Sequence, residues 1–193
     1  MMDTYIFLAD GFEEVEALCP WDLLLRAGVP VKLVSINADE NVTGTHGLKV
    51  RADVTAASLG EPKGKICVVL PGGMPGAANL DADPVVDKYV AHAAKHGHLG
   101  AICAAPFILG KRGILSGKEA TCYPGFEGQL EGARLSAKKT VTCRNVTTSR
   151  GMGLAYRFGI ELVSEICGKD AARKVCRATQ HRTFAGLKKT RTV

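Results

Sequence analysis

The sequence lacks the features that mark secreted, membrane and zinc-binding proteins. Its seven cysteines are scattered through 193 residues, with no Cys-x-x-Cys pair and no Cys/His cluster of metal-ligand spacing. An odd, unpatterned set of cysteines disfavours a disulfide framework and a zinc site, so we expect a reducing compartment and no metal. No apolar run approaches the roughly 18 residues of a membrane span. Because residues 6–9 lack the basic region and length of a signal peptide, we expect a cytoplasmic protein without a membrane partner.

Negative charge is scarce at the C-terminal end. The net charge of +6 arises in residues 169–193, which hold eight Lys/Arg against one acidic residue, whereas the other 168 residues hold 17 basic and 18 acidic residues. Such a segment can attract an anionic partner such as nucleic acid. No interleaved aromatic residues or nucleic-acid motif accompany the charge. We therefore interpret it as a solvated helix and a loose basic tail from about residue 181, with nucleic-acid binding as the less favoured alternative.

The rest of the sequence has an ordinary globular composition in which strands alternate with helices. With 46% hydrophobic and 23% charged residues, the chain is suited to one domain spanning residues 1–193. The alternation predicts an α/β fold, a flavodoxin-like doubly wound parallel sheet with helices on both faces and sites at the carboxyl ends of its strands. Strands are predicted over residues 4–9, 31–36, 66–70, 99–103, 119–123 and 141–148, a hairpin over 41–50, and helices over 13–27, 83–95, 104–111, 151–167 and 169–179.

The segment Ala101-Ile102-Cys103-Ala104-Ala105 joins a predicted strand to a predicted helix. Small residues around a nucleophile are what a sharp strand-to-helix turn requires, because larger side chains do not fit there. A helix N-terminus lowers the pKa of a thiol below its free value of about 8.5, so this position favours a thiolate at Cys103. The alternative is a buried core cysteine at the end of a strand.

Acidic residues follow the first predicted strand. Glu13 and Glu16, at positions i and i+3, share one face of the predicted helix. In a doubly wound sheet this turn opens at the same edge as the cysteine turn, so a carboxyl group can lie beside the thiol and transfer protons. Glutamates also suit a helix N-terminus for electrostatic reasons alone, which is our interpretation of Glu14.

A glycine-rich segment, Pro71-Gly72-Gly73-Met74-Pro75-Gly76, follows the buried strand at residues 66–70. The backbone N–H groups of Gly72 and Gly73, together with that of Ala104, are candidates to hold an oxyanion beside the cysteine. Turn geometry alone also favours glycine in such loops. The segment lacks the Gly-x-x-x-x-Gly-Lys-Ser/Thr pattern of a nucleotide P-loop.

These segments resemble the ThiJ/PfpI superfamily, and within it the branch of the parkinsonism-associated protein deglycase and its bacterial relatives. The resemblance implies a flavodoxin-like homodimer without a cofactor, with Cys103 as catalytic nucleophile and Glu16 as its partner. It implies a glutathione-independent glyoxalase or deglycase acting on methylglyoxal, glyoxal or their protein and nucleotide adducts, with an oxidative-stress sensor or redox chaperone as the alternative. The matching segments are Ala9-Asp10-Gly11-Phe12-Glu13-Glu14-Val15-Glu16, Leu70-Pro71-Gly72-Gly73, Ala101-Ile102-Cys103-Ala104-Ala105-Pro106 and Thr148-Ser149-Arg150-Gly151.

Two positions depart from the family pattern. Many members carry a threonine-histidine-proline segment where this chain has Tyr123 before Pro124, and a tyrosine does not accept a proton at neutral pH as an imidazole does. His46 occupies a position where some relatives have an arginine that reaches the partner subunit's site. We expect it to be an exposed loop residue and include it, with Glu13 and Tyr123, as a possible accessory residue.

Two other cysteine enzymes of similar fold are disfavoured. PfpI-type peptidases have histidine directly after the cysteine, where this chain has Ala104. Class I glutamine amidotransferases need a later His-x-Glu, whereas His181 is followed by Arg182-Thr183 and comes too late in the fold.

Overall fold

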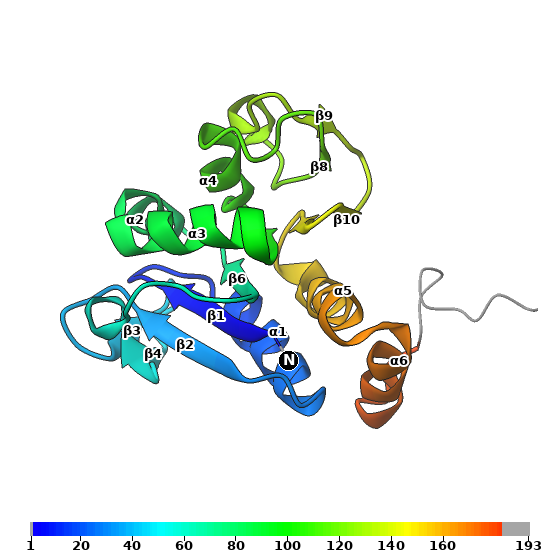
Figure 1. Cartoon of the computed structure of the whole chain (residues 1–193), viewed down its shortest axis with the longest axis horizontal. Helices are drawn as coiled ribbons and strands as arrows, with labels where there is room; N and C mark the ends of the chain where they lie inside the picture. The colour runs from blue at the N-terminus through cyan, green and yellow to red at the C-terminus, as the bar shows by residue number, and fades with distance from the viewer. Residues whose placement is uncertain (1, 183–193) are drawn as a thin grey trace, which may run out of the picture.

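A seven-stranded sheet forms the centre of the protein (Figure 1). The computed structural model describes residues 2–182, so the part of the predicted basic tail from residue 183 onward lies outside the described residues. The strand order is β10-β11-β7-β6-β1-β2-β5, and all neighbours are parallel except β10 and β11. The strands are β1 (Asp3–Leu8), β2 (Val31–Ser35), β5 (Val54–Thr55), β6 (Ile66–Leu70), β7 (His98–Ile102), β10 (Thr140–Cys143) and β11 (Val146–Ser149).

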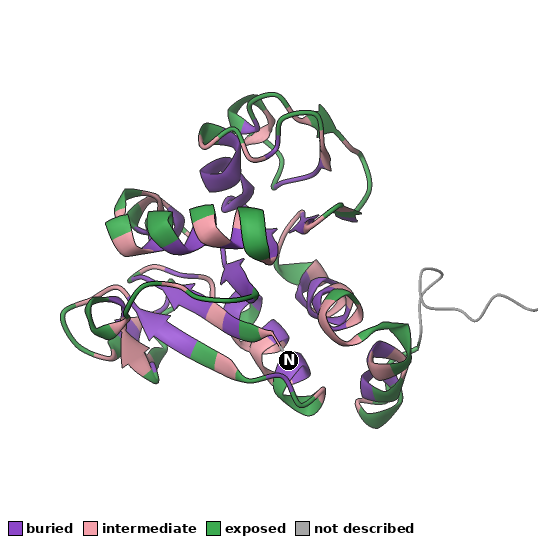
Figure 2. Ribbon diagram, viewed as in Figure 1, coloured by how far each residue is buried: buried purple, intermediate pink, exposed green. Residues whose placement is uncertain are grey.

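Helices cover both faces of this sheet, as the sequence predicts. Because side chains alternate along a strand, Ile6 and Leu8 of β1 join one core while Phe7 between them joins the other. Figure 2 shows the resulting buried sheet between partly exposed helices. The first core packs against α1 (Glu14–Arg26), α5 (Ala155–Cys167) and α6 (Lys169–Ala178), and the second against α2 (Gly76–Ala82), α3 (Pro84–His96) and α4 (Pro106–Lys111).

Helix α3 begins where its capping residues predict. Asp83 accepts hydrogen bonds through Oδ1 from the backbone N–H groups of Val85 and Val86, at 2.8 and 3.0 Å. Pro84 occupies the first position, where its missing N–H costs nothing. The helix therefore starts within a residue of its predicted start.

Three other elements differ from the sequence prediction. Residues 141–148, predicted as one strand, form the β10–β11 hairpin, because Arg144 adopts φ 54° and turns the chain. The predicted strand at 119–123 is reduced to β8 (Glu119–Ala120), which pairs with β9 (Arg134–Leu135) outside the central sheet. Helix α2 was not predicted.

The remaining short elements connect these layers. Strands β3 (Asn41–Thr43) and β4 (Lys49–Arg51) form the predicted antiparallel hairpin. Three turns of 3-10 helix cover Ala56–Ser58, Glu127–Gln129 and Met152–Leu154. Within residues 2–182 we find no helix with the length and hydropathy needed to span a membrane.

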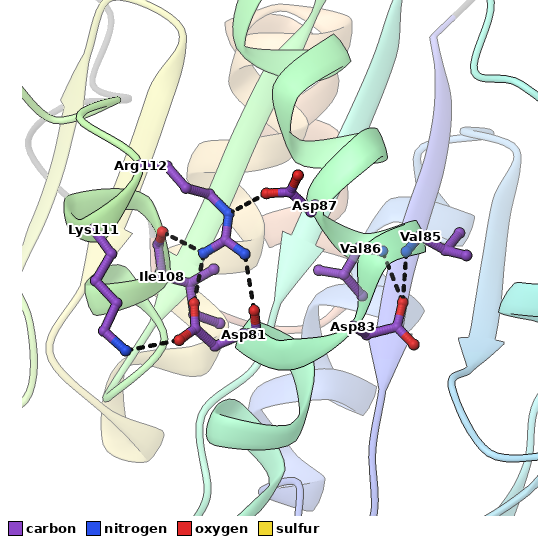
Figure 3. A network of polar contacts seen from close by, with 8 residues as sticks. All are labelled: Asp81, Asp83, Val85, Val86, Asp87, Ile108, Lys111 and Arg112. Atoms are coloured by element: carbon purple, nitrogen blue, oxygen red, sulfur yellow. Dashed lines mark hydrogen bonds and ion pairs between the residues drawn. The ribbon is translucent and has the colours of Figure 1, made fainter.

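Polar contacts tie the end of α4 to the end of α2 (Figure 3). The Arg112 guanidinium donates to Asp81 Oδ1 at 2.5 Å, to the Asp81 carbonyl at 2.9 Å and to Asp87 Oδ1 at 2.8 Å. Lys111 Nζ donates to the other oxygen of the Asp81 carboxylate at 2.8 Å. Since α2 follows the glycine-rich segment and α4 follows Cys103, this network joins the two segments that carry candidate site residues.

Candidate active site

Cys103 lies at the sharp turn between β7 and α4. Its φ of 63° is in the left-handed region, which is uncommon for a residue with a side chain and typical of strained functional turns. Its N–H donates to the Ser149 carbonyl at 2.9 Å, and its carbonyl accepts from the Tyr123 N–H at 2.8 Å. Ala104 and Ala105 are buried directly after it. The predicted strand–turn–helix geometry around Cys103 is therefore present.

Glu16 lies in the first turn of α1 and is completely buried. Glu13 caps this helix, since its Oε2 accepts from the Glu16 N–H at 2.7 Å. Glu16 Oε2 in turn accepts from the Gly72 N–H at 2.9 Å. Glu16 Oε1 is buried and has no hydrogen-bond partner among the described residues, although the carboxyl group as a whole interacts with the Cys103 thiol.

The glycine-rich segment closes the site from a third side. A Cβ atom at Gly72 would lie 2.6 Å from both Cys103 Cβ and Glu16 Oε2, and 3.1 Å from the sulfur. Gly73 has φ 85° and lies against the Gly11 carbonyl, 2.4 Å from where its own Cβ would be. Only glycine fits at these two positions, and its absence of a side chain lets the backbone approach the cysteine.

The protein environment shifts the protonation of both side chains. Burial raises the pKa of Glu16 from 4.5 to about 7, although the hydrogen bond from Gly72 acts in the opposite direction. Burial also raises the pKa of Cys103 to about 12, and the Glu16 carboxylate adds to this by repulsion and by holding the thiol proton. The pair therefore loses its first proton near pH 7, and the negative charge then lies on Glu16 because the thiol has the much higher pKa.

The sequence prediction that a helix N-terminus lowers the pKa of Cys103 is wrong in direction. Helix α4 begins only at Pro106, and the sulfur is largely buried against a carboxyl group. The groups that do stabilise negative charge on sulfur are the backbone N–H groups of Ala104 and Gly73. Of the three predicted oxyanion donors, these two face the sulfur, whereas the Gly72 N–H is used by Glu16.

Tyr123 and His46, two of the possible accessory residues, lie around Cys103 and Glu16 and make different contacts. Tyr123 is half exposed, and its ring lies against Gly151. His46 is exposed, as expected. It also contacts Glu14, which is expected from the sequence only to stabilise the N-terminus of its helix. Its backbone N–H and its Nδ1 contact the two carboxylate oxygens of the buried Glu14, at 2.7 and 2.8 Å, which lowers the pKa of Glu14 and raises that of His46. This contact fixes the β3–β4 hairpin beside the site.

Among residues 2–182, one group of side chains is close enough to hold a metal ion. Ligand atoms of Glu13, Glu14 and His46 lie within 4.8 Å of one another. Within the described residues, however, Glu13 caps α1, and both oxygens of Glu14 are already bonded to His46. These hydrogen bonds therefore explain why the three side chains lie close together.

The arrangement defines an α/β protein with a partly exposed cysteine beside a buried glutamate at the carboxyl edge of its sheet. The family model described as the DJ-1/PfpI family matches residues 2–165. This chain belongs to that family.

Known proteins of similar sequence and structure agree with this assignment. The chain is 34% identical to "Protein dj-1beta" of Drosophila melanogaster over 89% of its length and 93% of that protein. It is 30% identical to "Glutathione-independent glyoxalase DJ-1" of Schizosaccharomyces pombe, over 88% of this chain and 94% of that one. The solved structure of Drosophila DJ-1beta matches with a TM-score of 0.86 and 32% identity, over 94% and 99% of the two chains. These comparisons confirm the predicted fold class and family.

Proposed function

We propose that this protein is a cysteine-dependent, glutathione-independent glyoxalase or deglycase. Its substrates are glyoxal, methylglyoxal or the adducts that these aldehydes form on proteins and nucleotides. The observation that carries this proposal is the contact between the partly exposed Cys103 thiol and the buried Glu16 carboxyl group, with two backbone N–H groups facing the sulfur. The glyoxalase named among its relatives supports the same chemistry.

In the first step, Cys103 adds to the aldehyde carbon of methylglyoxal. The ionised Glu16 takes the thiol proton, the sulfur–carbon bond forms, and the carbonyl oxygen becomes an oxyanion. The N–H groups of Gly73 and Ala104, which face the sulfur, then stabilise that oxyanion; their position beside the thiol supports this role. Glu16 then returns its proton to this oxygen, which gives a hemithioacetal.

In the second step, Glu16 moves a proton between two carbons. Its carboxylate removes the hydrogen from the former aldehyde carbon and passes this proton to the ketone oxygen, which gives an enediol. Glu16 then takes the proton of the hydroxyl on the sulfur-bearing carbon and delivers a proton to the neighbouring carbon, so that this hydroxyl becomes the thioester carbonyl. The product is a thioester of lactate on Cys103. Water cleaves this thioester, releases lactate and restores the thiol, so the net reaction is methylglyoxal plus water to lactate.

The test is a steady-state assay with methylglyoxal and glyoxal in the absence of glutathione. We expect Cys103→Ala to reduce turnover at least about 10²-fold, the scale expected when a nucleophile or its proton acceptor is lost. Cys143→Ala, which removes a partly buried cysteine on β10, is the matched control and should retain activity. Equal activity of wild type and Cys103→Ala would contradict the proposal.

A second candidate function is an oxidative-stress sensor or redox chaperone, in which Cys103 is oxidised to a sulfinate. The unpartnered Oε1 of Glu16 favours it, because a protonated Glu16 could donate a hydrogen bond to a sulfinate oxygen. A similar solved structure is described as "Toxoplasma gondii DJ-1, oxidized" and has a TM-score of 0.86 and 27% identity. Peroxide titration with peptide mass analysis tests this role, and a sulfinate at other cysteines instead of Cys103 would contradict it.

We also propose that the protein is a homodimer. Large exposed apolar side chains include Val15 on α1, Leu48 in the turn between β3 and β4, and Met152 at the start of the 3-10 helix after β11. Burial of such side chains is what a subunit interface supplies. Light scattering after size-exclusion chromatography tests this: a mass near 41 kDa, twice the 20.4 kDa of one chain, is expected, and a mass of one chain would contradict it.

A further inference from the structure

A cavity lies at the edge of the sheet opposite Cys103. It has a volume of about 880 Å³, within the range of small-molecule sites. Its walls come from the segment before β6, the last turns of α3 and the turn before β11. These are the amino ends of the parallel strands, so a ligand here would not touch the candidate active site. The lining residues are Met2, Gly64, Lys65, His92, Ala94, Lys95, His96, Gly97 and Asn145.

The ionisable side chains of this cavity are all basic. Lys65 and Lys95 carry positive charge, and the lining includes no Asp or Glu within the described part of the chain. A cleft lined by one sign of charge concentrates counter-ions within it. The two imidazole rings lie together, with centroids 4.9 Å apart on the same face of α3.

Hydrogen bonds fix these walls in place before any ligand binds. His92 Nε2 lies 2.8 Å from the Gly64 carbonyl, and because a carbonyl only accepts, Nε2 carries the proton and Nδ1 is the nitrogen available to a ligand. Carbonyl groups at the end of a helix repel anions. Here the Asn145 side-chain amide donates to the carbonyls of Ala94 and Gly97, at 2.9 and 3.2 Å, and offsets that repulsion.

We propose that this cavity binds a phosphorylated small molecule. The two ammonium groups supply charge and hydrogen-bond donors for phosphate oxygens, and the fixed walls supply shape. A divalent metal ion held by the two histidines is the competing ligand, but two lysines beside the histidine pair oppose a cation. This inference does not depend on the proposed glyoxalase function.

The test is calorimetric titration of the full chain with pyrophosphate, ADP and glucose 6-phosphate in metal-free buffer. We expect the double variant Lys65→Gln/Lys95→Gln to weaken pyrophosphate binding at least about tenfold, since it removes two charge-assisted contacts. Lys32→Gln/Lys49→Gln removes two exposed lysines outside the cavity and should bind within about twofold of wild type. Tighter binding of ADP than of glucose 6-phosphate would identify a nucleotide, and the reverse a sugar phosphate.

Amide NMR shifts provide a second measurement that remains informative if the lysine variant is unstable. With pyrophosphate, the amides of Gly64, Gly97 and Asn145 should shift in wild type and in Cys103→Ala alike. The proposal is overturned if no phosphate compound binds, if both lysine variants weaken binding equally, or if the shifts appear around Cys103 instead. Binding of Zn²⁺ that is lost in His92→Gln, without any binding of phosphate compounds, would assign the cavity to a metal.

Discussion

At the scale of single residues, the side chains of the candidate site are packed tightly against backbone atoms. Gly72 lies against both Cys103 and Glu16 with no room for a side chain, and its N–H holds the glutamate in place. The Cys103 turn requires small neighbours, a positive φ and the Ser149 carbonyl as acceptor. These close contacts position the reactive side chains. We therefore expect even small substitutions at these positions to reduce activity strongly.

Gly72→Ala tests this crowding. The new methyl group would meet two site side chains at 2.6 Å, so Cys103 or Glu16 must move. We expect methylglyoxal turnover to fall by about 10²-fold, because misplacing catalytic groups by an ångström costs that much. Gly60→Ala, where nothing lies within 4 Å of the added Cβ, is the control and should retain full activity.

Glu16→Gln tests the raised pKa through stability. The pKa of Glu16 is about 7 in the folded protein against an ordinary value of 4.5, so the native state holds a proton that the unfolded chain releases. The stabilisation that this proton gives to the folded protein is complete below pH 4.5 and is lost as the pH rises through 7. At about 1.36 kcal/mol per pKa unit, the wild type should lose roughly 2–3 kcal/mol relative to Glu16→Gln between pH 5 and pH 8.

Urea unfolding of both proteins at pH 5 and pH 8 measures this difference. The exposed Glu131→Gln variant serves as the reference for a carboxylate removed from the surface. If the stability difference between wild type and Glu16→Gln is the same at both pH values, the burial argument for Glu16 fails.

At the scale of secondary-structure elements, most of the fold could be predicted from the sequence. Apolar runs with turn residues at their ends place the central strands, and Asp83-Pro84 gives the start of α3 directly. Helix α2 could not be predicted, because it is seven residues long and begins at Gly76, directly after a segment that reads as a turn. The β10–β11 hairpin was missed because Arg144 adopts a left-handed conformation that glycine or asparagine normally signals.

The site was predictable to a similar degree. Cys103 and Glu16 follow from motifs at the ends of strands, and the structure brings them together. The Glu14–His46 contact could not be predicted, because it joins residues 32 positions apart and depends on how the β3–β4 hairpin folds back. The direction of the Cys103 pKa shift depends on burial, which sequence patterns do not measure.

Arg112→Ala tests whether the α2–α4 network holds the site segments together. The Arg112 and Asp81 side chains are each 18% exposed, so truncating the arginine leaves the partly buried Asp81 carboxylate with Lys111 as its remaining partner. We expect a loss of about 2 kcal/mol in the free energy of unfolding, measured by urea denaturation. Arg26→Ala breaks an ion pair whose side chains are both 48% exposed and should cost less than about 1 kcal/mol. Similar losses for both variants would contradict the network's structural role.

At the scale of the whole molecule, the two cores share one sheet. Adjacent residues of β1 point into opposite cores, so neither helix layer can separate without exposing the strand between them. We therefore expect one cooperative unfolding transition. The single tryptophan, Trp21 in α1, reports one face by fluorescence, and circular dichroism reports all helices. Coincident urea transitions are expected, and two separate transitions would contradict the assignment of a single domain.

The claim that Cys103 and Glu16 act as one unit is tested most directly by the pH dependence of kcat/KM for methylglyoxal, without glutathione, in wild type and Glu16→Gln. Because the pair must lose one proton to become active, the wild-type value should rise with an apparent pKa near 7. In Glu16→Gln, kcat/KM should fall by at least about 10²-fold and the inflection near pH 7 should disappear. A Glu16→Gln variant that keeps the wild-type rate and the same pH profile would contradict the account.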